Sequence, residues 1–208
     1  LGVIVVGAGV LVMQGVDPKV LFNRVLAFIR SLGPATFFAA MAVLPSFGCP
    51  LTAFTLTVLP LFGGELGASA VVGLALASIA VNLAFSYWLS RYALRPWVER
   101  LLKWLGYTLP QVKTEDQLGL IVLVRVTPGP PYALQNFVLG LTAMPFGLYM
   151  GVSAVIVSLY SAAFILFGDA LVHGRGKMAF LAVSLFVAFT VGVKFLRRHY
   201  QRRQAKSS

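Results

Sequence analysis

Long apolar segments alternate with short basic segments along the chain. Residues 1–13 are apolar, and residues 17–30 place Lys19, Arg24 and Arg30 near helical spacing with apolar residues between them. The first segment predicts a membrane-anchoring helix, because no basic residue precedes Lys19 as one would in a signal peptide. The second predicts an amphipathic helix that lies in the membrane interface.

The segment from 32 to 90 is too long for one membrane span, and Glu65 is its one charged residue. Its interruptions are Pro45, Cys49–Pro50, Pro60 and Gly63–Gly64. They predict a helix at about 33–45, a broken re-entrant segment at about 46–64, and a complete span at about 67–90.

Residues 91–117 hold most of the charge in the middle of the chain. Apolar side chains recur there at helical spacing, opposite Glu99, Arg100 and Lys103. The pattern predicts a surface helix that begins near Pro96 and lies among the lipid headgroups. A helix that binds a protein partner is the alternative.

The segment from 118 to 145 is apolar, but it contains a lone arginine, Arg125, followed by a cluster of prolines. A charge and helix-breaking prolines are both costly at membrane depth, so together they are typical of a polar cavity. We expect complete spans at about 146–168 and 178–194, joined by a short loop. A basic tail begins at Lys194.

Composition places the chain among polytopic membrane proteins. Hydrophobic residues make up 59% of it and charged residues 11%, against about 25% charged in a soluble domain. The net charge of +11 comes from cations between apolar segments, where they orient a membrane protein and meet anionic lipid, so we expect no nucleic-acid partner. The one cysteine, Cys49, excludes an internal disulfide. No metal, nucleotide or catalytic-triad spacing occurs, so we expect no cofactor and no enzyme.

The cations also predict a topology. The tail after Lys194 has no acid, which places the C-terminus in the cytoplasm. The basic regions 91–117 and 14–30 fall on that same side if both broken segments are re-entrant and enter from opposite faces. Pro45 and Pro60 have the same separation as Pro130 and Pro145, which suggests a weak inverted repeat. Paired broken helices form the substrate site in inverted-repeat transporters.

We therefore predict an all-α integral membrane protein, a polytopic helical bundle with two opposed re-entrant broken hairpins. Its expected parts are an N-terminal membrane helix and interfacial helix (1–31), a core (32–170) with hairpins at about 46–64 and 118–145, and a last transmembrane helix with a basic cytoplasmic tail (171–208).

The run from Arg125 to Thr142 (RVTPGPPYALQNFVLGLT) resembles the core motif of the VTT-domain family, also called the SNARE-associated Golgi protein or DedA-like superfamily, and fits its TVP38-like branch best. Upstream, Leu44–Ser46 through Leu61–Gly64, then Gly67, and the Ser90–Arg91 pair also resemble it, so the likeness covers about residues 40–170. It implies a helical membrane protein with two opposed re-entrant hairpins. Some relatives scramble phospholipids, and others are implicated in returning polyprenyl-phosphate carriers or in proton-dependent transport.

The chain departs from the DedA pattern in its charges. That branch has acidic residues near the first hairpin and a second arginine shortly after the first. Here the stretch from Phe37 to Cys49 has no acid, and Pro131 takes the place of the second arginine. The remaining candidates for proton coupling are Glu65 and Asp169, both expected near the outer surface.

Arg125 is the first candidate for substrate binding, because its planar guanidinium suits a phosphate. Alternatively it bonds carbonyls of the broken hairpin or reaches the cytoplasmic interface. Asn136 is the second candidate, with a cap or a link between helices as the alternative. The other candidates shape the breaks and expose half-helix ends, whose dipoles favour an anion. They are Pro45, Pro50, Pro128, Pro131 and Gly140.

These features favour a lipid translocator, similar to a scramblase or flippase, that moves phospholipid or polyprenyl-phosphate headgroups across the bilayer. Its expected partners are membrane lipids with anionic headgroups, and a homo-oligomer is left open. One alternative is a secondary transporter of a small anionic solute, coupled to protons through Glu65 or Asp169. The other is a non-transporting membrane scaffold. We expect the protein in a bacterial inner (plasma) membrane.

Overall fold

The structure, a computed structural model, describes residues 30–105, 114–127, 129–142 and 144–174. Within these ranges the chain is helical and contains no strand, which confirms the all-α part of the prediction. The predicted first helix, nearly all of the interfacial helix, the last span and the basic tail lie outside the described residues. The elements are α3 (Gly33–Val43), η1 (Leu44–Phe47), α4 (Leu51–Leu66), α5 (Ala68–Trp88), η2 (Leu89–Leu94), α6 (Arg95–Trp104), η3 (Thr114–Asp116), α7 (Gln117–Val126), α8 (Tyr132–Leu141) and α9 (Phe146–Val172).

Two helical hairpins reverse the chain at the same local motif, Gly-x-Pro. Gly48 and Pro50 join η1 to α4, and Gly129 and Pro131 join α7 to α8. The two glycines have positive φ angles, 93° and 120°. The two prolines are the N-caps of the second arms, with extended backbone. Glycine takes a positive φ without steric cost, and proline suits a helix start because the first turn needs no donor there.

The proline spacing that suggested a repeat does not mark equivalent positions. Pro60 lies inside α4, which continues through Gly63–Gly64, whereas Pro145 is the N-cap of α9. The predicted breaks at Pro60 and Gly63–Gly64 are therefore wrong. Proline removes the donor for the carbonyl four residues earlier, at Leu56. Gly168 of α9 packs so closely on that carbonyl that a side chain there would overlap it, so the neighbouring helix covers the unbonded group.

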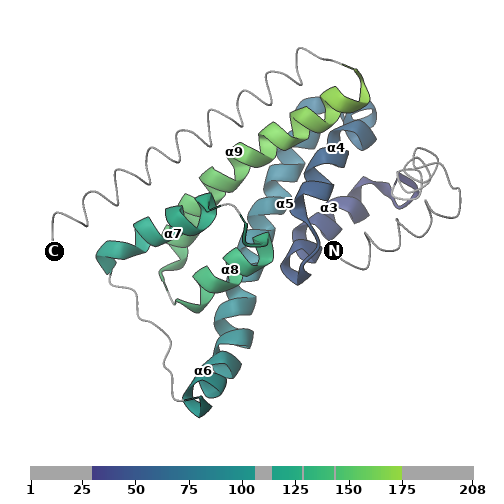
Figure 1. Cartoon of the computed structure of the whole chain (residues 1–208). Coiled ribbons are helices and arrows are strands. Elements are labelled where there is room, and N and C mark those ends of the chain that lie inside the picture. Colours follow the sequence, from purple (N-terminus) through teal and green to yellow (C-terminus); the bar gives the residue numbers. More distant parts are fainter. Residues whose placement is uncertain (1–29, 106–113, 128, 143, 175–208) are drawn as a thin grey trace, which may run out of the picture.

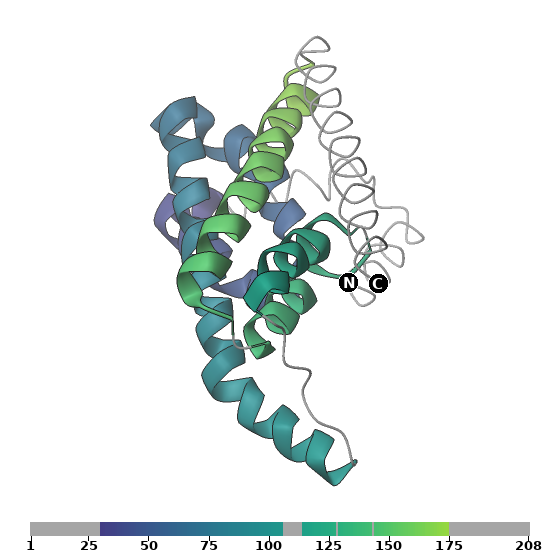
Figure 2. The same cartoon turned by 90° about the vertical axis from the view of Figure 1, so that its left-hand side faces the viewer.

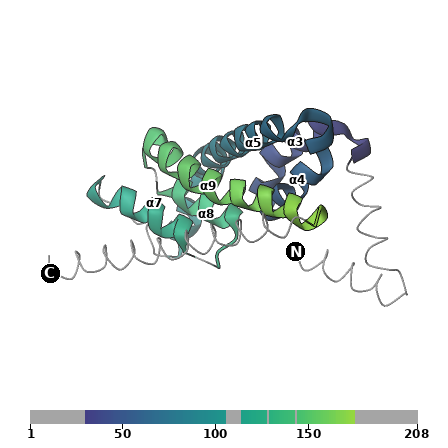
Figure 3. The same ribbon diagram turned by 90° about the horizontal axis from the view of Figure 1, so that it is seen from above.

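The two longest described helices, α5 and α9, pack against each other and carry both hairpins (Figure 1). In the first hairpin α3 packs on α5 and α4 on α9, while in the second α7 packs on α9 and α8 on α5. In each hairpin, the first helix therefore packs on the long helix that comes after the hairpin in the sequence, α5 for α3 and α9 for α7. The second helix also packs on the other long helix, α9 for α4 and α5 for α8. Figure 3 shows the two hairpins on opposite sides of α9, and η1 at the turn of the first hairpin reaches α8 of the second.

The helix that begins at Ala68 does not end at Trp88. It passes through η2, a π-helical segment, into α6, so that residues 68–104 form one continuous helix. The predicted helix with Pro96 in its first turn is α6, which begins at Arg95. It is not a separate helix, because it continues the one that begins at Ala68. Pro96 cannot donate to the carbonyl of Tyr92, and the wider π turn before it accommodates that loss. Figures 1 and 2 show α6 extending beyond the two hairpins and away from the bundle.

The second long helix, α9, ends later than predicted. It continues to Val172, so Asp169 lies in its last turn and not in a loop. The helices Ala68–Trp104 and Phe146–Val172 are both long and apolar enough to cross a membrane, judged by length and composition.

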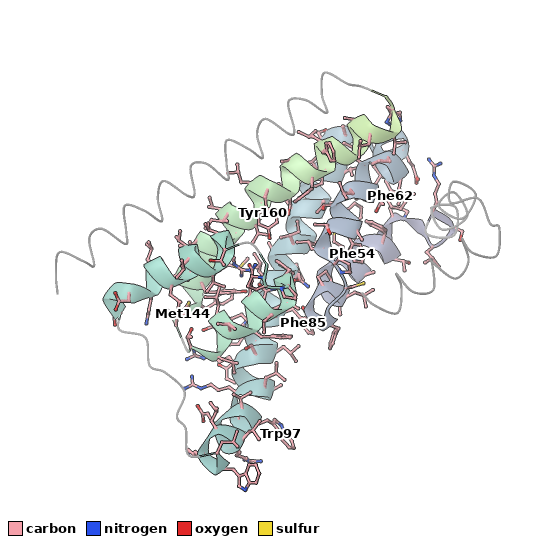
Figure 4. The ribbon with its side chains drawn as sticks, in the orientation of Figure 1. Phe54, Phe62, Phe85, Trp97, Met144 and Tyr160 are labelled. Carbon is pink, nitrogen blue, oxygen red and sulfur yellow. The ribbon has the colours of Figure 1, made fainter. Side chains whose placement is uncertain are left out.

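The core changes from apolar to polar between the two hairpins. Between α3 and α4, the rings of Phe37, Phe38, Phe54 and Phe62 pack with centroids 5.3 to 6.2 Å apart. Figure 4 labels Phe54 and Phe62. Toward the second hairpin the buried side chains are increasingly polar. The polar ones on α5, α8 and α9 are Ser78, Asn82, Ser86, Asn136, Ser153 and Ser161.

Candidate functional site

The polar part of the core converges on Arg125, in the last turn of α7 and only 5% exposed. Its Nε donates a hydrogen bond to Oγ of Ser153 at 3.1 Å, and its Nη2 donates one to the hydroxyl of Tyr149 at 3.2 Å. Both partners belong to α9. Among the described residues, the hydrogen bonds of Arg125 go to these side chains of α9 and not to a carbonyl of the hairpin, and they hold the guanidinium inside the bundle.

Tyrosine rings surround this guanidinium. Its central carbon lies 5.5 Å from the ring centroid of Tyr149 and 5.8 Å from that of Tyr132. Tyr160, labelled in Figure 4, lies three turns beyond Tyr149 on α9. The negative face of an aromatic ring attracts a cation, so the rings offset part of the cost of burying the charge.

Arg125 keeps an unpaired donor despite these contacts. Its Nη1 is buried without a hydrogen-bond partner, as are the hydroxyl of Tyr132 and Oγ of Ser161. Across the described ranges, no carboxylate lies within ion-pair distance of Arg125, since the ion pairs there are Arg95–Glu99 and Asp169–His173. A buried cation with an open donor and no counter-charge has the chemistry of an anion site.

Asn136 connects Arg125 to the long helix α5. Its Nδ2 donates to Oγ of Ser86 at 3.2 Å, and its Oδ1 lies 3.5 Å from the hydroxyl of Tyr149. That hydroxyl, which accepts from Arg125, also lies 3.3 Å from the carbonyl oxygen of Leu83. Both ends of the Asn136 amide are therefore engaged within the protein. The residue links helices and orients the hydroxyl that holds Arg125.

The same chain of hydrogen bonds continues into the first hairpin. Oγ of Ser86 lies 2.7 Å from Oγ of Ser46 in η1. Nδ2 of Asn82 donates to Oγ of Ser46 and to the carbonyl of Ala42, both at 3.0 Å. Ser46, Asn82 and Ser86 are at most 1% exposed. A buried polar network therefore runs from the turn of one hairpin to the arginine of the other.

The structure brings some of the predicted site residues together and separates others. Arg125 and Asn136 meet through Tyr149, and Pro45 is buried beside Ser46. Pro50 and Pro131 cap the second arms at the turns. Pro128 lies outside the described residues.

Gly140 has a packing role, because an added Cβ would lie 2.5 Å from Cβ of Ser90 on the adjacent helix. The two candidate acids are remote from the network. Glu65 is exposed near the end of α4, and Asp169 pairs with His173 at 3.0 Å.

The partners of Arg125 were not identified from the sequence. Tyr149 and Ser153 are one helical turn apart on α9, and Ser161 is two turns further along the same face. Ser78, Asn82, Ser86 and Ser90 recur every fourth residue on α5 and into η2. Polar residues at this spacing in two apolar helices were the signal that these faces are turned inward.

A second arginine anchors the chain at the π-helical segment. Nη1 of Arg91 donates to the hydroxyl of Tyr87 at 3.1 Å and to the carbonyl of Met144 at 3.3 Å, and the Tyr87 hydroxyl donates to that carbonyl at 2.7 Å. The Tyr87 and Tyr149 rings lie 5.0 Å apart. Ser90 donates to the carbonyl of Phe137 at 2.8 Å. The segment thus fixes the end of α8 and the start of α9, which carry Asn136 and Tyr149.

No family model, curated protein or solved structure matches this chain. The resemblance to the VTT-domain family therefore rests on the motif residues between Arg125 and Thr142 and their upstream counterparts.

Proposed function

We propose that the protein is an integral membrane lipid translocator in which Arg125 binds the anionic headgroup of a lipid on its way across the bilayer. The distribution of side chains supports a membrane setting. Val81 of α5 and Val155 and Leu159 of α9 are 50–69% exposed, while Asn82, Asn136 and Ser153 are fully buried. Water favours the opposite arrangement, and lipid favours this one.

Helix lengths support the same setting. α5 has 21 residues and α9 has 27, which at 1.5 Å per residue gives about 32 and 40 Å, enough for a hydrocarbon core of about 30 Å. The hairpin arms have 10 to 16 residues and reach only about 15 to 24 Å. Arms that are too short to cross are expected of two re-entrant hairpins, as the VTT-domain resemblance implies.

The incomplete pairing of Arg125 is the observation that carries the proposal. A charge inside a low-dielectric core is stable only when a counter-charge or a full set of hydrogen bonds compensates it. Tyr149, Ser153 and the tyrosine rings supply part of that compensation, and Nη1 stays open. A phosphate oxygen completes it, because guanidinium and phosphate form short charge-assisted hydrogen bonds. The substrate is then the missing counter-charge, while its acyl chains stay in the surrounding lipid.

A reconstitution experiment tests this function. The protein is placed in liposomes with a trace of headgroup-labelled anionic phospholipid, and an impermeant reductant bleaches the outer leaflet. With the native protein, we expect labelled lipid from the inner leaflet to reach the outer leaflet and be bleached during the assay. Arg125→Gln should lower the rate of this bleaching by at least tenfold. Arg30→Gln, an exposed cation on the first described residue, serves as the matched control. Equal rates for native protein and Arg125→Gln at equal reconstitution would refute the role of Arg125.

Transport of a small anionic solute is the second candidate, and the Asp169–His173 pair favours it. These two groups lie 3.0 Å apart at the end of α9, and proton relays in membrane proteins are built from carboxylates and imidazoles. Uptake of labelled inorganic phosphate into liposomes that responds to an imposed proton gradient, and loses that response in Asp169→Asn, supports this reading. Lipid exchange without phosphate uptake excludes it.

A further inference from the structure

Helix α6 presents an apolar face that nothing in the described structure covers. None of its residues is buried, and Trp97, Leu101 and Trp104 are 71%, 55% and 81% exposed. Leu105, just after the helix, is 51% exposed. These positions follow the i, i+4, i+7, i+8 pattern, so they share one face. Figure 4 shows Trp97 at the end of the molecule farthest from the two hairpins.

The opposite face of α6 is basic. It carries Arg95, Arg100 and Lys103, with Glu99 as its only acid. Nε of Arg95 lies 2.7 Å from Oε1 of Glu99, so the single negative charge is paired within the helix. The guanidinium of Arg100 lies 5.8 Å from the ring centroid of Trp97, at the border between the two faces. The surface therefore combines large aromatic side chains with an uncompensated positive charge.

The length of α5 indicates where α6 lies relative to the membrane. The 21 residues of α5 alone match the thickness of a hydrocarbon core. The helix continues beyond them, and the stacked rings of Trp88 and Tyr92, 5.2 Å apart, lie at the transition. Trp and Tyr are enriched at the membrane–water boundary. The π-helical segment Leu89–Leu94 begins directly after Trp88 and contains Tyr92. Such segments bend helices, and Figure 2 shows α6 departing from the line of α5. We therefore expect α6 to start at the boundary.

We propose that α6 docks on the surface of an anionic lipid leaflet, with its tryptophan face at the acyl boundary and its cations at the phosphates. This rests on the membrane setting of the proposed function and is independent of lipid translocation. Charge favours lipid over a second copy of the chain, because pairing two α6 helices brings Arg100 and Lys103 of both together, and the one acid of each helix, Glu99, is already paired with Arg95. An interfacial helix with Trp and Leu on one face and Lys and Arg on the other binds anionic lipid in two ways. Its apolar face is buried among the acyl chains, and its cations are attracted to the lipid phosphates.

Tryptophan fluorescence tests the proposal without an added label. The three tryptophans of the chain are Trp88, Trp97 and Trp104, so the emission reports on this continuous helix alone. The full-length protein is reconstituted with phosphatidylcholine or with added phosphatidylglycerol, and is quenched by chain-brominated lipid or by aqueous iodide. Trp88→Phe isolates the two α6 residues, and the Trp97→Phe, Trp104→Phe double variant isolates Trp88.

With anionic lipid, we expect Trp97 and Trp104 to be quenched by brominated chains and protected from iodide. In Arg100→Gln, Lys103→Gln this protection weakens, because each cation at an anionic surface shifts the docked-to-free ratio by about fivefold. The docking is overturned if iodide quenches Trp97 and Trp104 and brominated lipid does not. If brominated lipid still quenches Trp88 in that case, the membrane setting stands. Shielding from both quenchers indicates a protein contact and also overturns the docking. No lipid quenching of Trp88 contradicts the membrane setting itself.

Discussion

A close contact between α4 and α9 determines whether a Gly→Ala substitution in α9 stabilises or destabilises the protein. Gly168 on α9 packs against the carbonyl of Leu56, and a Cβ there would overlap three backbone atoms of that residue. Gly151 lies on the same helix, and a Cβ added there would have no neighbouring atom within 4 Å. Helix propensity alone predicts that Gly→Ala stabilises both sites by about 0.5–1 kcal/mol.

The structure predicts opposite outcomes for the two variants. Backbone atoms cannot rotate away as a side chain does, so Gly168→Ala must separate α4 from α9, at about 1–3 kcal/mol for an overpacked site. The separation also exposes the Leu56 carbonyl, which Pro60 leaves without a helical donor. The propensity gain applies to both variants and cancels, so they should differ by about 1–3 kcal/mol, with Gly151→Ala the more stable.

Thermal unfolding in detergent, followed by circular dichroism, measures this difference. For a chain of this size it corresponds to a midpoint for Gly168→Ala roughly 2–12 °C below that of Gly151→Ala. Equal midpoints, or a higher midpoint for Gly168→Ala, would show that α4 and α9 do not meet at this carbonyl and would refute the reasoning.

Three further variants test the polar network and the Arg91 anchor. Arg125→Met should abolish lipid exchange while keeping or raising the unfolding midpoint, because it removes a buried charge without a counter-ion; a large fall in the midpoint contradicts the anion site. Tyr149→Phe should lower stability by about 1–3 kcal/mol, since it leaves a second nitrogen of Arg125 unpaired; an unchanged midpoint argues against this bond. Arg91→Gln should lower the midpoint more than Arg95→Gln, because only Arg91 bonds the carbonyl of Met144, and equal melting curves contradict that anchor.

The helical breaks could be predicted from local chemistry. Gly48 and Pro50, and Gly129 and Pro131, stop and restart helices through backbone preferences that need no distant partner. The same local rules misjudged Pro60, where a neighbouring helix covers the carbonyl that the proline leaves free. A proline in sequence marks a lost donor, and only the packing around it determines whether the helix ends there.

The sequence by itself determined that one arginine lies in an apolar segment without an acid nearby, and that α5 and α9 are apolar enough to cross a membrane. The tertiary structure decided what surrounds that arginine. Tyr149 and Ser153 follow Arg125 by 24 and 28 residues, and Ser46 and Ser86 are separated by 40. Backbone preferences act over a few residues, whereas hydrogen bonds between side chains require a particular rotation and register of packed helices. The sequence could locate the charge, and the fold alone could show that its Nη1 has no partner.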